Sequence, residues 1–294
     1  MLRGGFPGFL NAAGRFLNAA GRFLNAAGWV PKFCEASSEL RNITMKTLHL
    51  LHTNDFHNHL SPAQAETIRQ AKARHENVLL LDSGDAISAG NVGVRPGGEP
   101  ILILMSETGY DAMTLGNREF HIADTLLRLK ISKARFPILS ANIRWRDDQG
   151  VSLPTVPHFL KTLPNGLRVG VFGLTVPMVT TRMAALLVSA FVFDDPVSTA
   201  QRQIEVLRPQ VDALIALTHL GLREDERLAA ACPELDLIVG GHSHNVLEAL
   251  KVVAGVPIAQ AGWFGHWLGQ TTLEWDTAGG RPRVTGRLVS LKEK

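Results

Sequence analysis

The fold of this chain is decided by the stretch Thr47-Leu48-His49-Leu50-Leu51-His52-Thr53-Asn54-Asp55-Phe56-His57. Residues 47–53 are rich in leucine and threonine and predict a buried strand. The chain then changes at once to asparagine, aspartate and histidine, which are residue types that bind divalent metals. One such segment means little by itself, because a single aspartate after a strand is more often a cap than a ligand.

Four further segments repeat this pattern at the end of an apolar run. They are Asp82-Ser83-Gly84-Asp85, Leu115-Gly116-Asn117-Arg118-Glu119, Thr218-His219 and Gly240-Gly241-His242-Ser243-His244. We interpret Asp82 as an acid that braces its loop. The remaining candidate ligands are two aspartates, one asparagine and four histidines, about the number that two adjacent divalent cations need. They are Asp55, His57, Asp85, Asn117, His219, His242 and His244.

Two metals about 3.5–4 Å apart need a bridging ligand, usually a carboxylate, and Asp85 is the natural candidate. Asp55 and His57 would complete one metal, and Asn117 and His219 the other. His242 and His244 are two residues apart on a glycine-rich turn and can aim one imidazole at each metal. This mixture of imidazole and carboxylate favours Mn, Zn, Fe or Co. Such a site predicts hydrolysis of a phosphate ester by a metal-bridging hydroxide.

The order of predicted elements explains why the five segments could meet. We predict strands at residues 47–53, 77–82, 110–115, 136–141, 212–217 and 235–239, and helices from residue 61 and at 99–108, 122–133 and 197–207. A hairpin turns at Pro164-Asn165-Gly166, and β-hairpins follow residue 256. Alternating strands and helices predict a largely parallel α/β sheet with added hairpins. Ligands bind such sheets at the carboxyl ends of strands, where all five segments fall.

Charge and composition exclude other classes of function. Residues 1–44 hold five of the 30 basic and two of the 27 acidic residues, which leaves 25 of each sign in residues 45–294. We therefore predict no nucleic-acid surface. No apolar run approaches the roughly 18 residues of a membrane span. Two cysteines, Cys34 and Cys232, cannot build a disulfide framework or a cysteine zinc site.

The first 44 residues form a separate problem, because the heptapeptide Arg-Phe-Leu-Asn-Ala-Ala-Gly occurs at residues 15–21 and 22–28. A glycine in each heptad costs roughly 1 kcal/mol of helix propensity, which argues against a coiled coil. No continuous apolar segment of a secretory signal is present, and an organelle presequence stays open. We interpret residues 1–44 as a disordered extension or a mis-assigned start, residues 45–294 as a single domain, and the location as cytoplasmic.

The five segments, together with Leu139-Ser140-Ala141-Asn142 and Gln260-Ala261-Gly262, resemble the calcineurin-like metallophosphoesterases, especially the metallophosphatase domain of the 5′-nucleotidases. The resemblance covers about residues 47–276. It implies a four-layer α/β/β/α sandwich of mixed sheets with a dinuclear centre. It also implies which ligands share a metal: Asp55, His57, Asp85 and His244 at one, and Asp85, Asn117, His219 and His242 at the other.

The chain departs from the family pattern Gly-Asn-His-Glu-Phe-Asp, because it has Gly116-Asn117-Arg118-Glu119-Phe120-His121. Asn117 and Arg118 are predicted to bind substrate, and Arg118 can stabilise charge on the phosphate. Its guanidinium stays cationic and so cannot serve as a proton donor. His121 titrates near neutrality and could restore acid catalysis. The alternative is that His121 is a surface residue at a helix start.

The number of residues after the end of the resemblance bears on which substrates the chain can recognise. The 5′-nucleotidases carry a C-terminal domain that stacks the nucleobase, whereas about 18 residues follow Asp276. We therefore expect an open site that takes small phosphorylated substrates, including nucleotides read only at the phosphate. Two alternatives stay open: a catalytically weak metal- and phosphate-binding module, and a hydrolase of a sulfate thioester. The sequence leaves the oligomeric state undecided.

Overall fold

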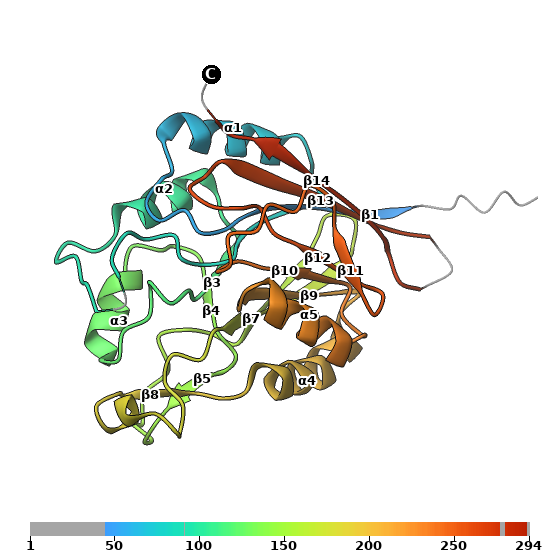
Figure 1. The fold of residues 1–294 in the computed structure, drawn as a ribbon. Helices are drawn as coiled ribbons and strands as arrows, with labels where there is room; N and C mark the ends of the chain where they lie inside the picture. Colours follow the sequence, from blue (N-terminus) through green and yellow to red (C-terminus); the bar gives the residue numbers. More distant parts are fainter. Residues whose placement is uncertain (1–44, 91, 277–279, 293–294) are drawn as a thin grey trace, which may run out of the picture. The chain divides into compact units, whose positions relative to one another are not determined.

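The computed structural model describes residues 45–90, 92–276 and 280–292. Two six-stranded mixed sheets lie at the centre of this part of the chain (Figure 1). The first sheet has the order β14-β13-β1-β2-β3-β4, with β1 (Lys46–Thr53), β2 (Val78–Asp82), β3 (Ala112–Thr114), β4 (Ile138–Leu139), β13 (Trp267–Trp275) and β14 (Arg283–Ser290). The second has the order β11-β12-β10-β9-β7-β6, with β6 (His158–Thr162), β7 (Arg168–Thr175), β9 (Ala213–His219), β10 (Leu237–Val239), β11 (Lys251–Val253) and β12 (Val256–Ala259).

Five α-helices are found among the described residues: α1 (Pro62–Ala73), α2 (Pro100–Thr108), α3 (Asp124–Ile131), α4 (Pro196–Leu207) and α5 (Leu222–Ala231). Two short 3-10 helices are η1 (Ala184–Leu187) and η2 (Arg208–Gln210). The predicted start of α1 is confirmed, because Ser61 and Gln64 form a reciprocal capping box. The predicted end of α2 is also confirmed: Gly109 adopts φ +90° directly after it.

Alternation of side chains along the strands creates the layers. Leu48 and Leu50 of β1 point into a core shared with the second sheet, which includes Val169 and Ile215. Leu51, which faces the other way, packs with residues of α1, α2 and α3. The second sheet repeats this arrangement, with Phe172 facing residues of α4 and α5. The layers are therefore α/β/β/α, and the predicted four-layer sandwich of mixed sheets is confirmed.

Three features differ from the predicted elements. Helix α5 was not predicted, because half of its residues are charged and it follows Gly221, which offers no side-chain cap. A two-stranded antiparallel sheet of β5 (Ile143–Trp145) and β8 (Phe191–Phe193) was also missed, since three-residue strands carry too little periodicity. The predicted strands at residues 110–115, 136–141 and 235–239 are shorter in the structure.

The parallel strands bring their carboxyl ends to one edge of each sheet. Thr53 of β1 pairs with Asp82 of β2, and Thr175 of β7 pairs with His219 of β9. The two edges are linked directly, because the Ser83 hydroxyl donates to the carbonyl of Val239 at 3.1 Å. The five polar segments thus face one another across two sheets.

The interpretation of residues 1–44 falls outside the described residues. Every element described here belongs to the unit that spans residues 43–294. No helix among the described residues combines the length and apolar character needed to cross a membrane.

Candidate metal centre

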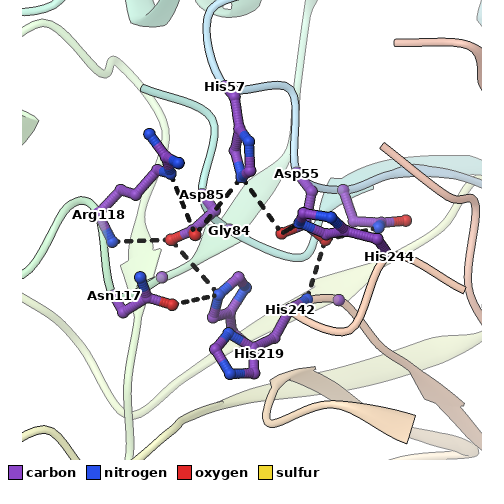
Figure 2. Close-up of polar contacts among 12 residues, drawn as sticks. Asp55, His57, Gly84, Asp85, Asn117, Arg118, His219, His242 and His244 are labelled. Carbon is purple, nitrogen blue, oxygen red and sulfur yellow. Dashed lines mark hydrogen bonds and ion pairs between the residues drawn. The ribbon is translucent and has the colours of Figure 1, made fainter. Parts of the chain in front are cut away.

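The loops after β1, β2, β3 and β10, together with the last residues of β9, bring all five polar segments to one place (Figure 2). The first sheet contributes Asp55, His57, Asp85 and Asn117, and the second contributes His219, His242 and His244. These are the seven residues predicted from the sequence as metal ligands.

The backbone at these positions is unusual. Five of the seven residues have positive φ: Asp55 (53°), His57 (46°), Asp85 (56°), His242 (72°) and His244 (57°). Such conformations cost of order 1–3 kcal/mol each outside glycine and cluster at functional sites. The first two loops hold each other in place, since the backbone N–H of Asp55 donates to the Gly84 carbonyl at 3.0 Å and that of His57 to the Asp85 carbonyl at 3.0 Å.

Asp85 lies between two histidines from different sheets. Its Oδ2 lies 3.6 Å from Nε2 of His57, and its Oδ1 lies 3.4 Å from Nε2 of His219. The backbone N–H of Arg118 donates to Oδ1 at 2.7 Å. Burial opposes ionisation of Asp85, but the charge and hydrogen bonding of His219 outweigh burial and hold the pKa of this carboxyl well below its usual range.

Asp55 lies close to the imidazoles of His57 and His244. Its Oδ1 lies 3.7 Å from Nε2 of His57 and 3.4 Å from Nε2 of His244, and its Oδ2 accepts the backbone N–H of His242 at 2.9 Å. Burial opposes ionisation here too, yet His244 and His57 lower the pKa of Asp55 far below its usual value. Two carboxylates therefore stay ionised within one buried site.

His219 shows why the site attracts a cation. Its Nδ1 lies 2.7 Å from the carbonyl oxygen of Ser83 and so carries a proton, which turns Nε2 toward Oδ1 of Asn117 at 3.1 Å and Oδ1 of Asp85 at 3.4 Å. Burial lowers the pKa of His219, but the Asp85 carboxylate outweighs burial and raises it to about 9. The nearby carboxylates thus favour a positive charge among these atoms, either a proton on His219 or a bound metal ion.

Orphaned polar atoms also fit a metal. Oδ1 of Asp55 and Nε2 of His57 are buried and have no hydrogen-bond partner among the described residues. Ligand atoms lie within 4.8 Å of one another in two groups, which are Asp55, His57 and His244, and Asp55, Asp85 and His219. Buried polar groups without partners are rare, and an ion is one of the explanations for them. The donor set of carboxylate oxygen and imidazole nitrogen suits a divalent transition metal.

His242 is placed differently from the other predicted ligands. Its side chain is exposed and belongs to neither of these two groups, and its ring centroid lies 4.9 Å from that of His219 in an edge contact. The glycine before it is required by space: a Cβ on Gly241 would lie 2.8 Å from the Ser83 carbonyl oxygen and 3.2 Å from Oδ2 of Asp55. The turn can therefore approach both aspartate loops only without a side chain.

Arg118 and His121 occupy different surroundings. The guanidinium of Arg118 donates to the Ser88 carbonyl at 3.1 Å, and its Nε lies 3.6 Å from Oδ2 of Asp85, so its charge borders the site. His121 is buried, and its Nδ1 accepts the backbone N–H of Ala123 at 2.9 Å. Burial and the charge of Lys130 lower the pKa of His121, which keeps most of its population neutral at pH 7. Its role as an acid stays a prediction.

Two residues of the site were missed by sequence reasoning. The fully buried Glu119 accepts the backbone N–H groups of Asp85 and Gly116 at 3.0 Å each and of Ile87 at 3.2 Å. Asn54 donates to Oδ2 of Asp55 at 2.7 Å and accepts from the backbone of Ala261. Both lie inside the polar segments, so their position was the available signal. The prediction that Asp82 braces its loop fits the structure, where it accepts from Thr53 and from the backbone of Gly84.

Comparisons with known proteins agree with this geometry. Residues 48–246 match the model of the calcineurin-like phosphoesterase family. The chain is similar to the trifunctional nucleotide phosphoesterase protein YfkN of Bacillus subtilis, with 31% identity over 79% of this chain and 18% of that protein. It is also similar to human 5′-nucleotidase, with 30% identity over 79% of this chain and 47% of that protein.

A solved structure gives the same picture. The 5′-nucleotidase precursor from Thermus thermophilus matches with a TM-score of 0.67 and 27% identity, over 83% of this chain and 54% of that chain. The chain thus spans about half the length, or less, of these relatives. The family model covers more than half of the chain and contains all seven candidate ligands. The chain therefore belongs to the calcineurin-like phosphoesterases, a family that works with divalent metals.

Proposed function

We propose that this chain hydrolyses small phosphate mono- or diesters, including 5′-nucleotides, with two divalent metal ions drawn from Mn, Zn, Fe and Co. The observation that carries the proposal is the position of Asp85, whose two oxygens face His57 on one side and His219 on the other. A carboxylate placed in this way suits a bridge between two cations. The printed names of the relatives, a nucleotide phosphoesterase and 5′-nucleotidases, support the substrate class.

The proposed ligands divide between two cations. Asp55, His57, Asp85 and His244 would hold one cation, and Asp85, Asn117, His219 and His242 the other. When bound, such a pair supplies Lewis acidity toward the phosphoryl oxygens and lowers the pKa of water to near neutrality. The His242 ring already lies in edge contact with that of His219, with centroids 4.9 Å apart, so this exposed imidazole is near the atoms of the second cation.

The protein's own residues would then orient and neutralise the ester. The side chain of Arg118 is 32% exposed and borders Asp85, so its guanidinium can reach a phosphate oxygen without leaving the site. The Asn117 amide oxygen lies 3.1 Å from Nε2 of His219, and Asn117 directly precedes Arg118 in the chain, so its amide can contact the same phosphate. The proton for the leaving alcohol is assigned to His121 or to solvent, because Arg118 cannot release one.

The test is hydrolysis of bis-p-nitrophenyl phosphate, p-nitrophenyl phosphate and 5′-AMP by the full chain loaded with Mn²⁺. We expect metal-dependent turnover that is lost in Asp85→Asn and kept in Asp148→Asn, whose exposed carboxylate accepts from the backbone of Gly150. Two bound metals with no turnover of any ester would contradict the proposal and favour a metal- and phosphate-binding module. Turnover that survives in Asp85→Asn would contradict the role of the bridge.

A further inference from the structure

Four rings gather beside the metal centre, and none of the chemistry above uses them. They are His59, Trp263, Phe264 and His266, and we refer to them as the ring cluster. Ring centroids lie 4.3 Å apart between His59 and Phe264, 5.9 Å between Trp263 and His266, and 6.4 Å between Trp263 and Phe264.

The ring cluster packs directly against two of the candidate ligands, His57 and His244. Phe264 lies in an edge contact with His57, with centroids 5.4 Å apart, and Trp263 stacks on His244 at 5.8 Å with an interplanar angle of 21°. The backbone N–H of Phe264 donates to the carbonyl of Asp55 at 2.9 Å. Phe264 also has φ +58°, a strained conformation for a bulky side chain that its surroundings must impose.

These rings are accessible to a ligand. His59 is exposed, and Trp263, Phe264 and His266 are half-buried, unlike the fully packed Phe56 nearby. A cavity of about 560 Å³ is lined by the rings of His59, Phe264 and His266. Asn58, Gln64 and Lys292 also line it. Its size falls in the usual range for small-molecule sites. Among the described residues that line it, no side chain is acidic.

We propose that the ring cluster is a stacking subsite for the nucleobase of an ester whose phosphate lies at the metal centre. The inference rests on the proposed function, because it names the substrate class of that same site. Ring faces stack with any base, since every base presents a π-face, so we expect little preference among bases. Asn58 offers hydrogen bonds to a base edge, and Lys292 places a cation where an anionic substrate approaches.

The experiment compares 5′-AMP with ribose 5-phosphate, which has the same primary alcohol as leaving group and lacks the base. For the Mn²⁺-loaded full chain, we expect a higher kcat/KM for 5′-AMP. Trp263→Ala should lower the ratio of the two kcat/KM values about 10-fold, equivalent to about 1.4 kcal/mol. Trp263→Phe should keep most of the ratio, because a ring face remains. Val206→Ala, which trims an exposed side chain on α4, should leave the ratio unchanged.

A second measurement separates the subsite from catalysis. Adenosine has no phosphate, and we expect it to quench tryptophan fluorescence in the wild type and less in Trp263→Phe, whether or not an ester is hydrolysed. Adenosine binding without turnover of either ester would support the subsite and contradict the proposed function. Turnover of ribose 5-phosphate with no preference for 5′-AMP and no adenosine binding would overturn the subsite alone. If Trp263→Ala does not fold, His266→Ala provides the same comparison.

Discussion

Glu119→Gln tests how the chain holds Asp85 in its strained conformation. The two carboxylate oxygens of Glu119 accept three backbone N–H groups, from Asp85, Gly116 and Ile87. Glutamine keeps the shape but turns one oxygen into a donor, so at least one backbone N–H loses its acceptor. A hydrogen bond to a charged group contributes roughly 1.5–3 kcal/mol, and we expect that loss of unfolding free energy. Freed from this brace, Asp85 should leave φ +56°, and metal affinity should fall about 10- to 100-fold.

The assay combines urea denaturation of the metal-free chain with calorimetric titration of Mn²⁺. Burial and the nearby Asp85 charge raise the pKa of Glu119 to about 7, so pH 8 keeps it mostly ionised during the measurement. Glu226→Gln is the matched control, because Glu226 is partly exposed and pairs with Lys251 on the surface. If Glu119→Gln unfolds at the wild-type urea midpoint and binds Mn²⁺ with wild-type affinity, Glu119 is not the brace.

Three further predictions concern charge at and near the site. Arg118→Ala should lower kcat on p-nitrophenyl phosphate about 10²-fold with little change in Mn²⁺ affinity, and unchanged kinetics would remove Arg118 from the mechanism. Burial raises the pKa of Asp225 from 3.8 to about 7, so the stability it contributes at acid pH is lost as pH rises through 7. The unfolding free energy of Asp225→Asn relative to that of the wild type should therefore rise by on the order of 4 kcal/mol between pH 3 and pH 9. Urea denaturation measures this difference, and a difference that does not change with pH would refute the prediction. Adding Mn²⁺ at 100 times its Kd should raise the unfolding free energy by about 2.7 kcal/mol, and a chelator should reverse the accompanying rise in Tm.

The sequence predicted which polar residues come together better than it predicted the bounds of the elements around them. Candidate ligands such as Asp55 and His219 were found because each ends an apolar run, and the carboxyl ends of parallel strands meet at one edge. The sharp turns at Asp55 and Asp85 could not be foreseen, since positive φ in these residues depends on contacts between loops. Glu119 was missed for a related reason: its carboxylate accepts the backbone N–H groups of Asp85 and Ile87, which lie 34 and 32 positions earlier in the chain. Helix α5 escaped because its buried face is narrow.

The ring cluster was also beyond sequence reasoning. His59 and His266 are about 200 positions apart in the chain, and the backbone contact between Phe264 and Asp55 brings their segments together. Only tertiary structure places aromatic rings beside ligands from another part of the chain. The same limit applies to His121, whose local turn directs its Nδ1 to the backbone of Ala123.

The division of the seven candidate ligands between two sheets has a consequence for how the domain folds. Four of them come from the first sheet and three from the second. Cations bound by both groups would therefore link the two sheets at the edge where their strands end. A chain with only its first sheet formed would present half of the donors and bind metal weakly. Metal binding would therefore indicate that both sheets have formed. Removing the metal with a chelator would weaken the contact between the sheets at the metal centre before the apolar core between them unfolds.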